Sequence, residues 1–151
     1  LNNLTNFLKN SNFVRKIFII SDTNVCRLHL QTLLSYIEQT NFSYFVYCFE
    51  PGEQSKNKEV LFDLYDFLIE SKADRNTPLL AFGGGVVGDV ASFAASTFMR
   101  GMPLIHVPTT VVSQTDSSIG GKTAINHPKG KNLIGTFYQP NAVFIDTKYT
   151  K

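Results

Sequence analysis

The sequence has little of several features that would assign a protein class at once. It contains no tryptophan and only two cysteines, Cys26 and Cys48. Two cysteines are too few for the disulfide framework of a small secreted domain, so we expect free thiols in the core of a cytoplasmic protein. No apolar run approaches the roughly 18 residues of a membrane-spanning helix. The first residues also lack the pattern of a signal peptide.

A strong excess of charge of one sign is also missing. The 14 Lys and Arg residues against 12 Asp and Glu residues give a net charge of +2, too balanced for a nucleic-acid arm or an acidic tail. Between residues 90 and 145, however, the only acid is Asp116. The same stretch holds four basic residues: Arg100, Lys122, Lys129 and Lys131. This favours an anionic small molecule as the ligand, and the alternative is a chance spacing of solvated lysines.

The length of 151 residues predicts one domain with a sizeable core. Apolar runs typical of strands lie at 16–20, 44–49, 78–82 and 103–107. Helical patterns lie between them at 25–40, 58–72 and 90–99. This alternation predicts an α/β fold, a Rossmann-like parallel sheet flanked by helices. After Pro108, glycines divide a polar, hairpin-like region that precedes a last predicted strand at 142–146.

A glycine-rich turn links the third predicted strand to the next helix. Residues 83–88 read GGGVVG and fit the pattern G-x-G-x-x-G. Glycines there let the backbone approach a pyrophosphate, and the helix N-terminus supplies amide donors. The usual dinucleotide fold carries this motif after its first strand and has an acid about 20 residues on, and both are missing here. The turn therefore indicates a non-standard phosphate site, with a plain glycine turn as the alternative.

Two other candidate sites fail on spacing. Gly121-Lys122-Thr123 resembles the end of a P-loop, but Asp116 occupies the position of the loop's first glycine, and its carboxylate would repel phosphate. The three histidines, His29, His106 and His127, are scattered and show no metal-ligand spacing. We therefore expect no complete metal site in this chain.

Six motifs follow one another in the second half of the chain, at 83–89, 98–101, 107–110, 114–116, 120–126 and 130–140. In order and approximate spacing they resemble the 3-dehydroquinate synthase family, over about residues 17–146. The resemblance implies that residues 1–151 are an NAD-binding N-terminal domain and less than half of a typical member. A helical, metal-binding C-terminal domain would be absent from the chain, with Leu1 and Lys151 as cut points.

The resemblance also implies two sets of site residues. The cofactor set is Asp22, Asn24, Glu53, Lys56, Gly84, Gly85, Asp89, Thr109, Thr110 and Lys131. Among these, Asp22 and Asn24 would lie near the adenosine ribose and supply the acid that the standard fingerprint lacked. The catalytic and substrate set is Asp116, Lys122, Asn132 and Arg100. Lys122 and Asn132 suit a phosphate and sugar hydroxyls, and Arg100 would reach the substrate phosphate of a neighbouring subunit.

The activity implied by the resemblance belongs to the shikimate pathway. It converts 3-deoxy-D-arabino-heptulosonate 7-phosphate to 3-dehydroquinate and phosphate, through transient oxidation by NAD, phosphate elimination, re-reduction and aldol cyclisation. A divalent metal, zinc or cobalt, would have its ligands outside this chain, and the whole enzyme would be a homodimer. We expect the chain alone to be inactive. Three alternatives stay open: another sugar-phosphate cyclase, an iron-dependent dehydrogenase relative, and a non-catalytic nucleotide-binding module.

Overall fold

A computed structural model of the chain describes residues 1–111 and 121–150. Its helices are α1 (Asn2–Lys9), α2 (Thr23–Ile37), α3 (Lys58–Glu70) and α4 (Gly85–Thr97). The strands are β1 (Lys16–Asp22), β2 (Ser43–Phe49), β3 (Leu79–Gly83), β4 (Leu104–Pro108), β5 (Lys122–His127), β6 (Gly130–Phe137) and β7 (Ala142–Val143). Short 3-10 helices lie at η1 (Glu53–Ser55), η2 (Phe98–Arg100) and η4 (Thr147–Thr150).

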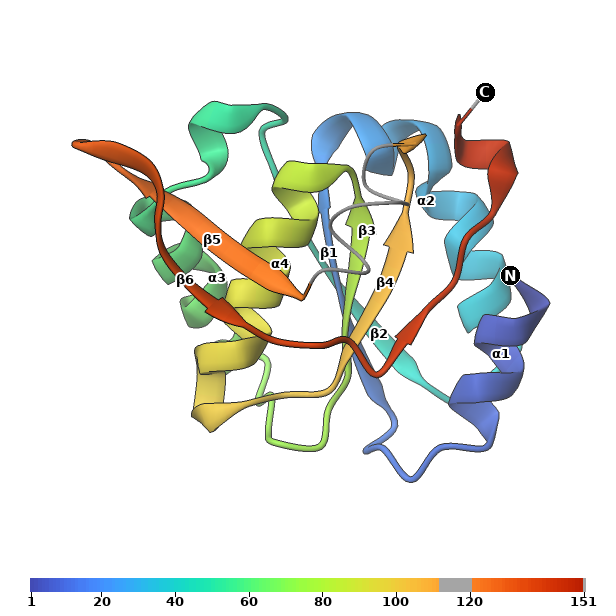
Figure 1. Ribbon diagram of the computed structural model, residues 1–151. Helices are drawn as coiled ribbons and strands as arrows, with labels where there is room; N and C mark the ends of the chain where they lie inside the picture. The colour runs from blue at the N-terminus through green and yellow to red at the C-terminus, as the bar shows by residue number, and fades with distance from the viewer. Residues whose placement is uncertain (112–120, 151) are drawn as a thin grey trace.

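Five of the strands form one parallel sheet in the order β2-β1-β3-β4-β7. Helices cover both of its faces (Figure 1), which confirms the predicted Rossmann-like α/β fold. The other two strands, β5 and β6, pair antiparallel as a separate hairpin. This hairpin packs beside α4 and forms the hairpin-like region expected after Pro108.

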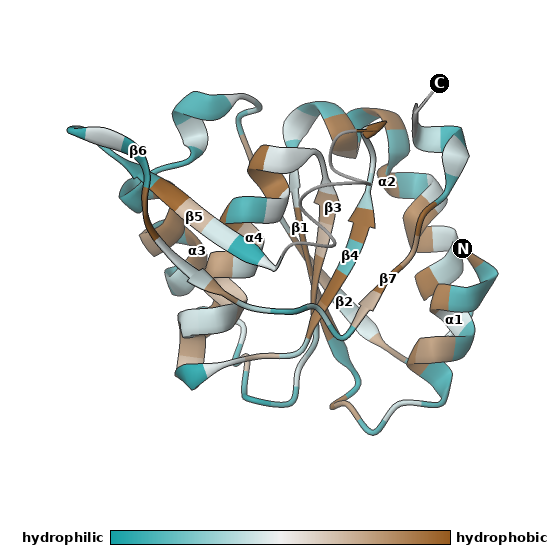
Figure 2. Ribbon diagram, viewed as in Figure 1, coloured by the Kyte–Doolittle hydropathy of each residue, from teal (hydrophilic) through white to brown (hydrophobic). Residues whose placement is uncertain are grey.

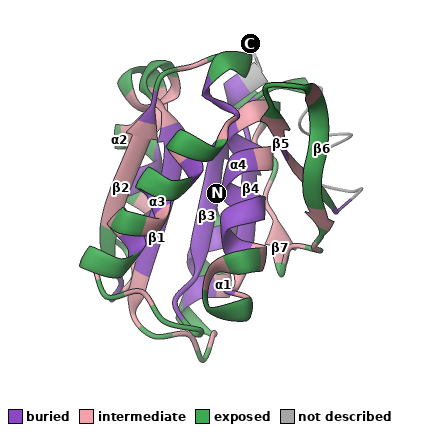
Figure 3. Ribbon diagram, turned by 90° about the vertical axis from the view of Figure 1, so that its left-hand side faces the viewer, coloured by how far each residue is buried: buried purple, intermediate pink, exposed green. Residues whose placement is uncertain are grey.

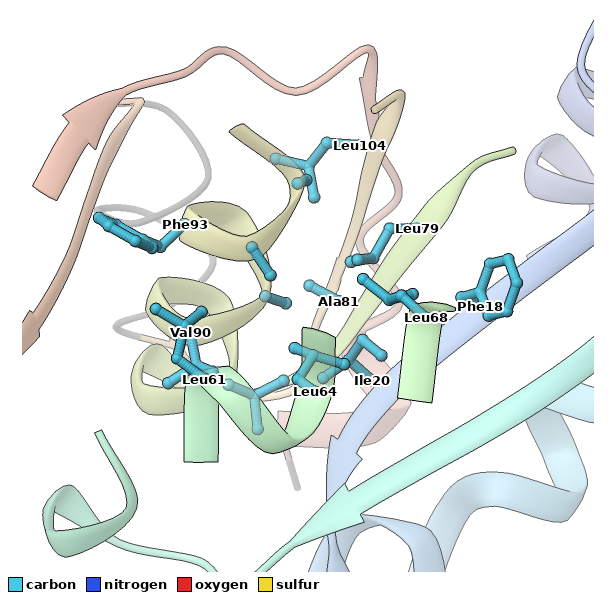
Figure 4. Packing of buried hydrophobic residues seen from close by; sticks show 14 of the residues in the cluster. Phe18, Ile20, Leu61, Leu64, Leu68, Leu79, Ala81, Val90, Phe93 and Leu104 are labelled. Carbon is cyan, nitrogen blue, oxygen red and sulfur yellow. The ribbon is translucent and has the colours of Figure 1, made fainter. Parts of the chain in front are cut away.

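Apolar residues of the central strands divide between two cores. Phe18 and Ile20 of β1 belong to a cluster with α3 and α4, whereas Ile17 and Ile19 belong to a cluster with α1 and α2. The central strands are therefore apolar along their length (Figure 2) and buried (Figure 3). Figure 4 shows the first cluster, with leucines of α3 packed near Val90 and Ile20. A sheet covered on both faces needs no polar alternation.

Polar side chains cap the first turns of two helices. Asp22 Oδ1 accepts a hydrogen bond of 2.8 Å from the Val25 amide at the start of α2. Asn57 Oδ1 accepts one of 2.8 Å from the Val60 amide at the start of α3. Each bond satisfies an amide that has no partner inside its helix. The turn after β1 is therefore fixed locally by Asp22.

Three elements differ from the prediction. α4 begins at Gly85 and not near residue 90, because the turn that the glycines were expected to form ends at Gly84, the N-cap residue. The last strand covers only residues 142–143, since only two residue pairs join it to β4. Helix α1 was not expected; its buried Leu4 and Leu8 pack against α2 and the sheet. No helix in the described part of the chain is long and apolar enough to cross a membrane.

The expectation of free core cysteines is wrong. Cys26 of α2 and Cys48 of β2 form a disulfide across 22 positions of sequence, and each is partly exposed. Spacing in the sequence could not reveal the pair, because it depends on how α2 packs over β2. The two cysteines therefore give no support for a reducing compartment.

Candidate functional site

The glycine turn joins β3 to α4 at the carboxyl edge of the sheet. A Cβ atom at Gly83 would lie 2.7 Å from Val87 Cγ2, and one at Gly84 would lie 3.2 Å from Thr110 Cγ2. At Gly85 a Cβ atom would meet nothing within 4 Å. Gly83 is therefore required by packing, whereas the space over Gly85 is open at the N-terminus of α4. Free helix amides at such a terminus bind phosphate oxygens.

Two threonines complete this turn from the neighbouring strand. The Thr109 amide donates a hydrogen bond of 2.9 Å to the Gly83 carbonyl oxygen, which holds the end of β4 beside the turn. Thr109 is buried, and Thr110 is exposed next to Gly84. The structure thus brings together four residues of the expected cofactor set: Gly84, Gly85, Thr109 and Thr110.

Lys56 connects three segments that are distant in sequence. Its Nζ lies 2.6 Å from Asp89 Oδ2 and 2.5 Å from Asn132 Oδ1. A Glu53 carboxylate oxygen lies 3.9 Å from the same ammonium group. The Lys56 side chain is only 6% exposed. The charge of Lys56 therefore contacts residues of η1, of the second turn of α4 and of the hairpin. Each of these segments was expected to carry a site residue.

The carboxyl group of Asp89 is partly buried next to Lys56. Burial raises the pKa of Asp89 above its usual value, while the hydrogen bond and charge of Lys56 act in the opposite direction. The nearby charge of Glu53 raises the pKa further. The Lys56 ammonium group therefore opposes the effect of burial on the pKa of Asp89. The ionised form of Asp89 depends on Lys56 staying in place.

Asn126 is a site residue that the sequence analysis missed. Its amide donates to the Lys56 carbonyl oxygen over 2.8 Å, and its side-chain Nδ2 donates to Glu53 Oε1 over 3.0 Å. Asn126 Oδ1 also accepts a bond of 2.9 Å from the Asn132 amide. Asn126 is the last residue of the sequence motif at 120–126. Its place in that motif was the signal that could have identified it. It attaches the hairpin to the segment that carries Lys56.

A cleft of about 510 Å³ opens beside this network, between α4 and the hairpin. Asp89, Lys122 and Asn132 line it. Lys122 is the first residue of β5 and is exposed, and Asn132 adopts a left-handed backbone conformation with φ of 58°. Asparagine tolerates this conformation better than most residues. The cleft combines an ammonium group with an amide, a combination that binds oxyanions and hydroxyls.

Four other expected site residues are not among those that line the cleft. Arg100 follows the far end of α4, a helix about 20 Å long. Lys131 is exposed on the hairpin. Asp22 and Asn24 lie where β1 meets α2, and Asp22 uses one carboxylate oxygen as a helix cap. Asp116 lies outside the described residues.

Metal ligands were not expected in this chain. Among residues 1–111 and 121–150, no group of three or more His, Cys, Asp or Glu side chains is arranged to hold a metal ion. His106 instead hydrogen-bonds Ser92 Oγ through Nε2 over 3.0 Å. Burial lowers the pKa of His106 to about 4. The buried imidazole is therefore neutral near pH 7 and joins β4 to α4.

The parallel sheet, the glycine turn and the adjoining cleft define a Rossmann-like domain of the class found in sugar-phosphate cyclases. A solved 2-deoxy-scyllo-inosose synthase, in complex with carbaglucose-6-phosphate, NAD⁺ and Co²⁺, is 32% identical with a TM-score of 0.88, over 97% of this chain and 41% of its own. The 2-epi-5-epi-valiolone synthase ValA of Streptomyces hygroscopicus, with NAD⁺ and Zn²⁺ bound, is 28% identical with a TM-score of 0.85, over 94% of this chain and 41% of its own.

The family model for the N-terminal part of 3-dehydroquinate synthase matches residues 46–151. A 3-dehydroquinate synthase of Prochlorococcus marinus (strain MIT 9515) is 51% identical over 137 residues, which are 91% of this chain and 38% of that protein. The chain belongs to the 3-dehydroquinate synthase family. It spans less than two fifths of the length of this relative. Family membership also separates it from the iron-dependent dehydrogenases left open above.

Proposed function

We propose that this chain supplies the NAD site and part of the substrate site of an enzyme that makes 3-dehydroquinate and phosphate from 3-deoxy-D-arabino-heptulosonate 7-phosphate. The observation that carries the proposal is the network in which Lys56 joins Asp89 to Asn132. It connects the helix start expected to bind the cofactor with the hairpin expected to bind the substrate. Family membership supports the same assignment.

The cofactor side of the proposal rests on the glycine turn. Open space over Gly85 at the N-terminus of α4 suits a pyrophosphate, and Thr110 offers a hydroxyl beside Gly84. Asp22 and Asn24 would bond the adenosine ribose. The other members of the proposed cofactor set are Glu53, Lys56, Asp89, Thr109 and Lys131. When bound, NAD supplies a hydride acceptor that returns the hydride later in the cycle.

The substrate side rests on the cleft. Lys122 would neutralise the substrate phosphate, and the side-chain Nδ2 group of Asn132 would donate to a substrate oxygen. Asp116 would accept hydrogen bonds from sugar hydroxyls. Lys56 keeps Asn132 in position, because its ammonium group donates to Asn132 Oδ1 and leaves the Nδ2 group free to face a ligand. In this arrangement Lys56 organises the site, and Lys122 contacts the substrate.

The remaining partners are proposed from the family. The relatives described above bind NAD⁺ with Zn²⁺ or Co²⁺, and we extend a divalent metal to the whole enzyme. We propose, as the family resemblance implies, that its ligands lie outside this chain. We further propose a cytoplasmic homodimer in which Arg100 reaches the substrate phosphate of the partner subunit.

Turnover by the protein in its natural length tests the proposal. Wild type should release phosphate and 3-dehydroquinate in equal amounts, with no net production of NADH. Lys122→Ala should lower kcat/KM by at least about 30-fold, since a hydrogen bond to a charged group contributes roughly 2 kcal/mol. Lys129→Ala, at an exposed position of the same hairpin, is the matched control and should leave turnover unchanged. Equal activity of the two variants would show that Lys122 does not bind the substrate.

A second candidate is a sugar-phosphate cyclase with another substrate. It is favoured by the structural similarity to 2-deoxy-scyllo-inosose synthase. Product analysis distinguishes the two, because each cyclase forms a different carbocycle from its own sugar phosphate. Formation of a product other than 3-dehydroquinate, from a substrate that is turned over faster, would favour this second candidate.

A further inference from the structure

The disulfide between Cys26 and Cys48 joins the first turns of α2 to the end of β2. We propose that it is a reversible thiol–disulfide site, which a dithiol reductant opens and which adjusts the affinity of the cofactor-binding edge of the sheet. The effect on affinity rests on the proposed NAD site. The exchange chemistry does not depend on that site, so separate experiments test the two parts.

The bridge lies close in sequence and strand register to the expected cofactor residues Asp22 and Asn24. Cys48 lies opposite Ser21 in the β1–β2 register, one residue before the helix cap Asp22. Cys26 follows two residues after Asn24. The bridge therefore clamps the turn that would hold the adenosine ribose against the end of β2.

The segment that follows β2 extends this connection to Lys56. Ser55 Oγ donates a hydrogen bond of 2.5 Å to the Glu50 carbonyl oxygen, two residues after Cys48. The Lys56 amide then donates to the Glu53 carbonyl oxygen over 3.0 Å. A short, hydrogen-bonded segment thus runs from the disulfide to the ion pair with Asp89, so a shift at Cys48 is transmitted to the site.

Exposure of the pair also supports the exchange. Both cysteines are partly exposed, although Val46, two positions before Cys48 on the same face of β2, packs into the core cluster of α1 and α2. The bridge therefore lies at the rim of that core, where a dissolved thiol can reach it. Purely structural disulfides are typical of small domains that cannot bury enough apolar surface. This domain does not need such compensation, because an apolar cluster lies on each face of its sheet. A role in exchange fits this position better than a role in holding the core together.

The exchange is a two-electron transfer from the dithiol to the protein. A thiolate of the reductant attacks the Cys48 sulfur, the bond between the two cysteines breaks, and Cys26 leaves as a thiolate that takes up a proton. The second thiol of the reductant then displaces Cys48 and becomes part of a disulfide itself. Cys26 is the better leaving group, because the N-terminal turns of a helix favour a thiolate. The reverse reaction with an oxidised dithiol restores the bridge.

Opening the bridge should weaken cofactor binding. In the closed form the two segments are already fixed next to each other, so binding does not have to order them. In the open form the two segments move independently. NAD binding must then also order them, which costs free energy. We expect the dissociation constant for NAD to rise about fivefold on reduction, at the low end of usual coupling between sites.

A redox titration of the protein in its natural length tests the exchange. The protein is equilibrated in mixtures of reduced and oxidised dithiothreitol, the free thiols are blocked with a maleimide, and peptides carrying Cys26 and Cys48 are quantified by mass spectrometry. Both cysteines should change together and return on reoxidation. Thiols that stay fully alkylated in every mixture, or a bridge that opens only in denaturant, would overturn the proposal.

Calorimetric titration of NAD into the oxidised and reduced wild type then tests the effect on the site. A double variant, Cys26→Ser with Cys48→Ser, should bind like the reduced form in every redox buffer, which controls for effects of the buffer itself. Equal affinity in both wild-type states would overturn the inference while leaving the NAD site intact. Absence of NAD binding in both states would instead contradict the proposed function. Reduced wild type needs no substitution, so the comparison stands even if the double variant fails to fold.

Discussion

At the scale of single residues, Lys56 has the most unusual environment of the proposed site. Its ammonium group is buried between Asp89 and Asn132, with Glu53 farther away. A buried cation is tolerated only where several oxygens compensate for its lost hydration. The three neighbours come from three different segments, so this one side chain couples their positions.

Lys56→Met should therefore lower the free energy of unfolding by about 2 kcal/mol at neutral pH, because Asp89 is left without its cation. The pKa of Asp89, already raised by burial, would rise further. The folded state then holds the proton more tightly than the unfolded state, so stability falls as the pH rises from about 4 through the raised pKa. Urea unfolding at pH 4 and pH 8 should show the larger loss at pH 8. The exposed Lys58→Met is the control, and an equal loss at both pH values would contradict the interpretation.

His106 gives a second prediction that depends on pH. Its ring is buried against Ser92, and burial lowers its pKa from the usual 6.5 to about 4. The unfolded chain therefore binds a proton before the folded chain does, and stability falls as the pH drops from about 6.5 to about 4, by up to roughly 3 kcal/mol. His106→Gln should remove most of this slope in unfolding curves measured across that range. The exposed His127→Gln should keep the slope, and a slope that survives in His106→Gln would exclude His106 as its source.

At the scale of elements, the β5–β6 hairpin holds Lys122 and Asn132 at the cleft. Gly135 allows the two strands to approach, because a Cβ atom there would collide with the Thr123 carbonyl oxygen. Thr123 and Thr136 also hydrogen-bond each other through their hydroxyls over 2.6 Å. The register of the hairpin therefore depends on a small residue at position 135.

Gly135→Ala should loosen the hairpin and leave the parallel sheet intact. We expect a loss of about 1 to 3 kcal/mol, as in other overpacked sites. Amide hydrogen exchange should become faster in β5 and β6 but not in β1, β3 or β4. Gly130→Ala is the control, because a Cβ atom there would meet only the end of the Leu133 side chain, which is exposed and can move. Unchanged exchange in the hairpin of Gly135→Ala would show that the register does not need this glycine.

The elements set by local sequence were predictable, and those set by distant contacts were not. The alternating strands, the cap at Asp22 and the glycine turn follow from residues next to each other in the chain. The hydrogen bond between Lys56 and Asn132 spans 76 positions of sequence, so no local pattern predicts it. The same holds for the disulfide, which depends on the packing of α2 against β2. The resemblance to the family identified Lys56 and Asn132 as separate site residues. Their contact became visible only in the folded structure.

At the scale of the whole molecule, the proposed binding residues cluster where the parallel strands end. Both faces of the sheet are used for apolar packing, which leaves the carboxyl edge for polar residues. The turn after β1, the segment after β2 and the glycine turn after β3 all lie there. Ligands of open α/β sheets bind at this edge. Packing and binding are therefore separated in this chain, and substitutions that affect one without the other can be chosen.

Calorimetric titration of NAD into wild type, Gly85→Ala and Gly83→Ala tests whether the glycine turn binds NAD. A Cβ atom at Gly85 enters open space, and alanine is favoured over glycine in a helix, so Gly85→Ala should fold as stably as wild type. It should nevertheless bind NAD at least about tenfold more weakly, a loss of about 1.4 kcal/mol, because the methyl group occupies the approach of the pyrophosphate. Gly83→Ala should instead lower stability through its contact with Val87. Wild-type NAD affinity in Gly85→Ala, or no binding of NAD by wild type, would contradict the account.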